Sequence, residues 1–172
     1  PGTANRREAL SDLDSFRQEV RQWLEQNCPE SQRQPITPRE QYWGGRRGSF
    51  PSEDARLWYE RMRDRGWIAP EWPAQYGGGG LSDQQARVIK REMQRIRART
   101  PLYGIGLWML GQALLEYGSE EQKQKHLRAI INGETRWAQG YSEPGAGSDL
   151  ASLQCRAQDQ GDHFLVNGSK IW

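Results

Sequence analysis

The spacing of the apolar residues changes once along this chain, at about Gly133, and this change restricts the folds that it can adopt. Up to that point apolar residues recur three and four positions apart, the period of a helix that packs on one face. Beyond it, short apolar stretches alternate with turn residues. The pattern predicts an α+β chain, with an N-terminal all-α helical domain over residues 1–134 and the start of an antiparallel β domain over residues 135–172. The last strand begins near Lys170 and stops at Trp172, so we expect the β domain to be incomplete.

Capping residues indicate where the helices begin and end. A Ser followed three residues later by Gln or an acidic residue can close a helix N-terminus, and Gly commonly follows the last turn. These signals predict helices over about 11–28, 52–65, 82–96, 100–117 and 119–133. The fourth helix would have Thr100 as its N-cap and Pro101 as its first residue. Its apolar residues lie nearly all round, which is typical of a central, buried helix.

Prolines and glycines exclude a helix from residues 67–80, and the tryptophans there are expected to anchor this loop on the helical core. Strands are predicted over 135–142, 155–158 and 164–166. Turns are predicted at Gly161–Asp162 and at Asn167–Gly168, where Asn-Gly is a strong hairpin signal.

Composition excludes several classes of protein. The net charge is only +2 and basic residues are scattered, which argues against a nucleic-acid partner. Cys28 and Cys155 form no CxxC pair, His126 and His163 lack metal-ligand spacing, and no stretch is long and apolar enough for a membrane span. A cytoplasmic location is therefore expected. Because the chain begins at Pro1, a mitochondrial matrix protein that has lost a transit peptide is the alternative.

One segment concentrates residues that can bind a ligand. Residues 139–149 read Gln-Gly-Tyr-Ser-Glu-Pro-Gly-Ala-Gly-Ser-Asp, a predicted strand that leads into a glycine-rich turn. Gly145 and Gly147 can take positive φ and expose amide groups to an anion such as phosphate, and Ser148 adds a hydroxyl donor. A dinucleotide fingerprint would need a third glycine where Leu150 stands, and a Walker loop would need a Lys before Ser148. By composition alone, an ordinary strand and turn is the more frequent outcome.

The order of these residues resembles the signature of the acyl-CoA dehydrogenase family. The stretch from Phe164 to Trp172 is similar to the family's second flavin-contacting strand. The Pro-Glu-Trp-Pro stretch at 70–73 and the Tyr-Gly-Ser-Glu-Glu-Gln-Lys stretch at 117–123 are similar to two earlier landmarks. The resemblance extends from about residue 10 to the end of the chain.

The resemblance implies a helical domain, a β domain and a C-terminal four-helix domain, with FAD between the last two. It implies α,β-dehydrogenation of an acyl-CoA thioester, in which a glutamate takes the α-proton and the β-hydrogen leaves as hydride to the flavin. That base belongs to the C-terminal domain or its approach, so no catalytic residue is expected in this segment. Glu143 and Asp149 are rejected as the base, and Glu143 is expected to bond to turn amides.

The resemblance also assigns cofactor contacts. Gln139, Tyr141 and Ser142 match positions at the flavin ring, where Ser142 would hydrogen-bond the pyrimidine edge. Gly147 and Ser148 match the turn that holds the diphosphate, and Ser148 also matches an acyl-CoA contact. Trp172 matches an aromatic residue packed on the flavin; without the resemblance, a core tryptophan would be preferred.

Further partners are implied, and alternatives stay open. Relatives pass electrons to an electron-transfer flavoprotein or a similar acceptor, and they are homo- or hetero-oligomers. An acyl-CoA oxidase-like flavoenzyme and a non-catalytic partner subunit of the same fold are the rival interpretations. The acyl-chain specificity, the acceptor and the oligomeric state do not follow from the sequence.

Overall fold

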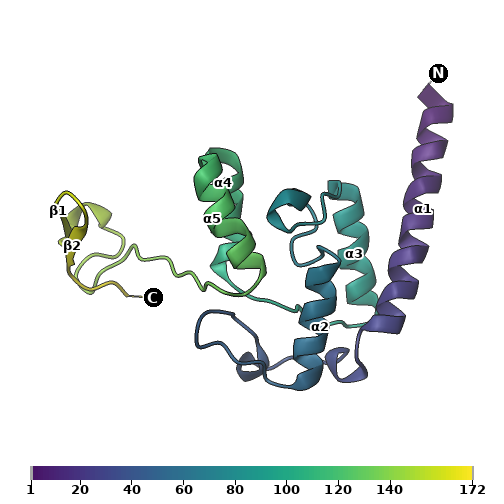
Figure 1. The fold of residues 1–172 in the computed structure, drawn as a ribbon, viewed down its shortest axis with the longest axis horizontal. Coiled ribbons are helices and arrows are strands. Elements are labelled where there is room, and N and C mark those ends of the chain that lie inside the picture. Colours follow the sequence, from purple (N-terminus) through teal and green to yellow (C-terminus); the bar gives the residue numbers. More distant parts are fainter. Residues whose placement is uncertain (1, 172) are drawn as a thin grey trace. The chain divides into compact units, whose positions relative to one another are not determined.

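The computed structural model describes the backbone of residues 2–171 and the side chains from Asp12 onward. The chain forms two compact units, one reaching Arg136 and the other starting at Trp137. The first unit is helical and the second carries a β hairpin (Figure 1). The α-helices are α1 (Gly2–Asn27), α2 (Glu53–Asp64), α3 (Asp83–Arg95), α4 (Gly111–Tyr117) and α5 (Glu120–Ile131). The strands are β1 (Arg156–Asp159) and β2 (Phe164–Asn167).

Three helices start at the predicted serine caps. The Ser52 hydroxyl accepts a hydrogen bond from the Ala55 amide at 3.1 Å at the start of α2. Reciprocal capping boxes open α3 and α5, formed by Ser82 with Gln85 and by Ser119 with Gln122. In each case the side chains satisfy amide groups that have no partner within the helix.

Two helix predictions are wrong. Helix α1 begins at Gly2, so Ser11 lies inside it and does not cap it, although α1 ends at Asn27 as expected. The segment after Thr100 is not helical until Gly106–Leu110, a single π-helical stretch that leads into α4. Gly104 adopts a φ of 146°, which no α-helix allows, and it delays the start. Figure 1 shows the extended chain between α3 and this helix.

The segment 106–117 is also not the buried centre of the helical unit. Trp108 is 63% exposed and Tyr117 is 80% exposed. The core lies instead among α1, α2 and α3, where the largest buried side chains belong to different helices. They include Val20, Leu24, Trp58, Met62, Val88 and Ile89.

The loop between α2 and α3 is anchored by its aromatic side chains, as predicted. Trp67, Trp72 and Tyr76 are almost fully buried. The Trp67 ring meets that of Trp23 edge to face, with 4.7 Å between the ring centroids. Gly66 follows Arg65, the C-cap of α2, and adopts a φ of 72°, a conformation for which Gly is the favoured residue.

The second unit contains an antiparallel hairpin in which Arg156 pairs with Asn167 and Asp159 with Phe164. Its turn is closed by the Gln160 amide, which donates to the His163 carbonyl at 2.9 Å. The predicted hairpin turn at Asn167–Gly168 is wrong, because Asn167 is the last residue of β2 and Gly168 follows it without forming a turn. Residues 135–142 form no regular strand in the described chain. The Ile171 amide donates to the Ser142 carbonyl at 2.9 Å, but in the described residues this contact does not extend into the regular ladder that defines a strand.

Candidate functional site

The candidate site is centred on a tight turn in the second unit. The Glu143 amide donates to the Ala146 carbonyl at 2.9 Å, and the Ala146 amide donates to the Glu143 carbonyl at 3.0 Å. Pro144 and Gly145 form the tip between them. The predicted positive φ at Gly145 and Gly147 is not found. A Cβ at either glycine would meet nothing within 4 Å, so open space borders the turn at both positions.

This turn also has hydrogen-bond donors that no described residue engages. Within residues 2–171, the amides of Gly145, Gly147 and Ser148 donate to no other residue. All three residues are exposed, and Ser148 adds its hydroxyl. Adjacent backbone amides that lack a protein partner suit an anionic oxygen, and the residues present therefore fit a phosphate group.

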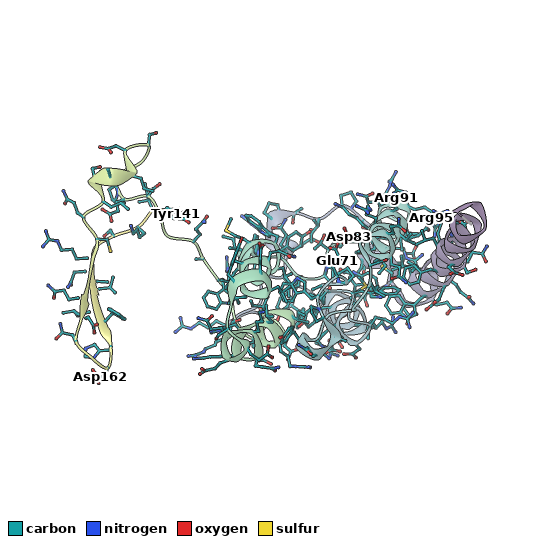
Figure 2. The ribbon with its side chains drawn as sticks, turned by 90° about the horizontal axis from the view of Figure 1, so that it is seen from above. Glu71, Asp83, Arg91, Arg95, Tyr141 and Asp162 are labelled. Atoms are coloured by element: carbon teal, nitrogen blue, oxygen red, sulfur yellow. The ribbon has the colours of Figure 1, made fainter. Side chains whose placement is uncertain are left out.

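The stretch before the turn contains the residues predicted to contact a flavin ring. Tyr141 is 59% exposed and precedes the hairpin in the sequence. Figure 2 labels Tyr141, and it labels Asp162 at the tip of the hairpin. Ser142 is half-buried; its carbonyl accepts the Ile171 amide, while its hydroxyl bonds to no other described residue. Gln139 is exposed. These residues lie on one short segment with Gly147 and Ser148, whereas Trp172 lies outside the described residues.

Glu143 is held within the fold rather than offered to a substrate. It is 7% exposed, and its carboxylate accepts hydrogen bonds from the Gln154 amide at 2.7 Å and the Cys155 amide at 2.9 Å. The prediction that Glu143 bonds to turn amides is corrected in detail, because both donors lie just before β1. These amides, first that of Gln154, and the nearby ammonium of Lys170 lower the pKa of the Glu143 carboxyl.

Lys170 is a residue that the sequence reasoning missed. Its ammonium donates to the Tyr141 carbonyl at 2.9 Å and to Glu143 Oε1 at 3.0 Å. A signal was present, since a buried carboxylate needs a cation, and Arg156 and Lys170 are the basic residues that follow Glu143. Sequence spacing alone does not choose between them.

A pocket of about 480 Å³ lies beside the turn. Its lining brings the turn tip together with the start of β1 and the end of β2, through residues that include Gly145, Ser152, Cys155 and Gly168. The volume falls within the range of small-molecule sites. In the part of the chain that the structure describes, no helix is long and apolar enough to cross a bilayer.

Comparison with known proteins finds a family match over most of the chain. Residues 11–134 match the family described as acyl-CoA dehydrogenase, N-terminal domain. "Acyl-CoA dehydrogenase IpdE1" of Mycobacterium tuberculosis is 34% identical over 163 residues, which are 95% of this chain and 41% of that protein.

Solved structures agree with the sequence match. A structure described as the Tcur3481–Tcur3483 steroid ACAD is 36% identical, with a TM-score of 0.62, over 94% of this chain and 39% of that one. The ChsE4–ChsE5 complex from Mycobacterium tuberculosis is 29% identical, with a TM-score of 0.61, over 94% and 38%. The chain thus spans about two-fifths of the length of the relatives that it matches.

Proposed function

Because this chain belongs to the acyl-CoA dehydrogenase family, we propose that it is part of an FAD-dependent enzyme that removes the α- and β-hydrogens of an acyl-CoA thioester. The observation that carries the proposal is the turn at 143–148, where unpartnered amides and the Ser148 hydroxyl adjoin open space within the family's signature. Bound FAD would supply the hydride acceptor that protein side chains lack.

The turn would hold the charged part of the cofactor. The amides of Gly147 and Ser148 point to a role at the diphosphate, where donors to a charged oxygen bind more strongly than donors to a neutral one. Ser148, whose hydroxyl is exposed, would also contact the acyl-CoA.

The preceding stretch would orient the flavin ring. Ser142 has a hydroxyl free to donate to the pyrimidine edge, and such a donor stabilises the negative charge of the reduced ring. Tyr141 and Gln139 would border the ring, and Trp172 would pack on it. These roles come from the family resemblance, and the exposure of Tyr141 and Gln139 leaves them open to contact.

We place the catalytic base outside residues 1–172. Glu143 is a poor candidate because two amides and Lys170 stabilise its ionised form, which lowers its affinity for a proton. Asp149 is exposed and is not among the residues that line the pocket beside the turn. We therefore offer neither residue as the base.

The partners follow from the same proposal. An electron-transfer flavoprotein or a similar acceptor would reoxidise the flavin. Two of the similar structures are named for two gene products, which favours a hetero-oligomer over a single-subunit assembly. We propose a cytoplasmic location, since relatives that match over most of this chain come from mycobacteria.

The experiment uses the full-length protein with its partner subunit, purified with FAD. We expect a bound-flavin absorbance that bleaches when an acyl-CoA is added without oxygen and returns with a dye acceptor. Oxygen consumption that matches turnover would instead identify an oxidase. A protein that binds no FAD, alone or with its partner, would contradict the proposal and favour the non-catalytic subunit.

A further inference from the structure

Lys170 joins separate segments of the second unit. Its ammonium donates to the Tyr141 carbonyl and to the Glu143 carboxylate, while the same carboxylate accepts the amides of Gln154 and Cys155. The neighbouring Ile171 amide donates to the Ser142 carbonyl. Residues 170 and 171 thus hold the backbone carbonyls of residues 141 and 142 by hydrogen bonds, and the side chain of Glu143 is held by Lys170 and by the two amides before β1.

In the second unit, this hydrogen-bond network takes the role that an apolar core has in most domains. Among residues 137–171, Glu143 and Ala146 are the only buried residues. Apolar packing therefore does little to hold the turn against the hairpin, and the charge-assisted hydrogen bonds of Glu143 take that role. A carboxylate this buried is costly without a cation, and Lys170 is the cation that contacts it.

The fit of the lysine stem is close. A Cβ on Gly140 would lie 3.3 Å from Cγ of Lys170, which is tighter than ordinary contact. The absence of a side chain at Gly140 lets the stem pass over the backbone, and the ammonium then reaches the carbonyl of the next residue. The contact to Tyr141 thus depends on both the length and the charge of Lys170.

We propose that Lys170 is a positioning residue for the flavin site: it anchors the Tyr141 carbonyl and thereby sets the backbone of residues 141–142 for the cofactor. This inference rests on the function proposed above. It separates two tasks of one side chain, since the bond to Glu143 stabilises the fold and the bond to Tyr141 orients the site.

The test compares variants of the full-length protein by FAD dissociation constant and by thermal unfolding of the apoprotein. Lys170→Met keeps an apolar stem without the charge, and we expect the FAD dissociation constant to rise at least tenfold and the apoprotein to melt earlier. Lys125→Met is the matched control, because Lys125 is exposed on α5 and its ammonium forms no hydrogen bond or ion pair with another described residue. It should alter neither value.

The double variant Lys170→Met/Glu143→Gln distinguishes the two tasks. Removing the carboxylate charge removes the unpaired buried ion, so the melting temperature should recover, while FAD binding should stay weak because Tyr141 remains unanchored. Recovery of both values together would overturn the proposal and leave Lys170 a structural residue, as would unchanged FAD affinity in Lys170→Met. Hydrogen exchange of the backbone amides of residues 141–143 in the apoproteins gives a second readout, and we expect faster exchange in both variants. If the unmodified protein binds no FAD, the proposed function itself fails, which is a different result.

Discussion

Ser148 places its hydroxyl beside amides that have no partner within the described residues. We expect Ser148→Ala in the full-length protein to weaken FAD or acyl-CoA binding more than it lowers stability. A hydrogen bond to a charged group contributes about 1.5–3 kcal/mol, equal to roughly a ten- to hundredfold change in affinity. Titrating the apoprotein with FAD, and the holoprotein with the enoyl-CoA product, measures both. Equal affinities in the variant and the parent would remove Ser148 from the site.

Ser142 has two possible roles that separate under mutation. If its hydroxyl donates to the flavin, Ser142→Ala should lower the reduction potential of bound FAD, because the reduced anion loses a donor. A donor worth about 1.4 kcal/mol corresponds to about 30 mV for a two-electron couple. If the hydroxyl only supports the turn, the variant should melt earlier at an unchanged potential. Redox titration beside a thermal melt distinguishes these results.

Gly111, the first residue of α4, lies against the ring of Trp72. A Cβ there would be 2.1 Å from Cζ2 of that ring, and Trp72 is only 2% exposed, so the ring has little room to move. Overpacking costs about 1–3 kcal/mol, while replacing Gly in a helix returns at most about 1 kcal/mol. We expect Gly111→Ala to destabilise the chain by about 1–2 kcal/mol in urea unfolding. Gly145→Ala, with nothing within 4 Å of its Cβ, is the control and should be near neutral.

For helices and strands, the features that depend on residues close in sequence could be predicted, whereas the features that depend on contacts with distant segments could not. The caps at Ser52, Ser82 and Ser119 depend on residues three positions apart, so the sequence contains all that is needed. The exposure of the segment 106–117 depends on which surfaces other elements cover. Its apolar residues therefore led to the wrong prediction of a central, buried helix. The candidate turn was located from its residues, but the partners of Glu143 lie 11, 12 and 27 positions away.

A buried carboxylate links α1 to α3. Glu92 is 5% exposed and accepts both Nε and Nη2 of Arg21, at 3.0 and 3.1 Å, and Nε of Arg95 at 2.6 Å. The Arg21 hydrogen bonds, as the largest cause, lower the pKa of Glu92. Figure 2 labels Arg95 on α3.

The lowered pKa of Glu92 predicts how the stability of the helical unit changes with pH. A carboxyl whose pKa is lower in the folded chain adds stability above its unfolded pKa, about 4.3, and that stability is lost as the pH falls through the folded value. We expect the free energy of unfolding in urea to decrease when the pH is lowered below about 4.5. Glu92→Gln should make this decrease shallower, and it should lower stability at neutral pH. An equally steep acid decline in Glu92→Gln would assign the effect to other carboxyls.

For the whole molecule, the sequence predicted two parts of different character, and the structure has a helical unit and a hairpin unit. The boundary at residue 134 stays a prediction. The helical unit has its own aromatic and aliphatic core, whereas the described part of the second unit relies on the hydrogen bonds of the buried Glu143 carboxylate and on its ion pair with Lys170. Its apolar strand residues have no such cover, since Phe164 is 65% exposed and Val166 is 60% exposed.

These exposed strand residues predict how the 172-residue chain behaves when expressed alone. A short hairpin with open edges and apolar side chains tends to pair with other chains, because unpaired amides and carbonyls template a new strand. We expect the isolated chain to bind a hydrophobic dye and to associate as its concentration rises in sedimentation experiments. Phe164→Ser/Val166→Thr should reduce both effects with little change in the melting of the helical unit, because its core contains neither residue. If association persists in this variant, the chains associate through another apolar surface, and Trp108 and Tyr117 are the next residues to replace.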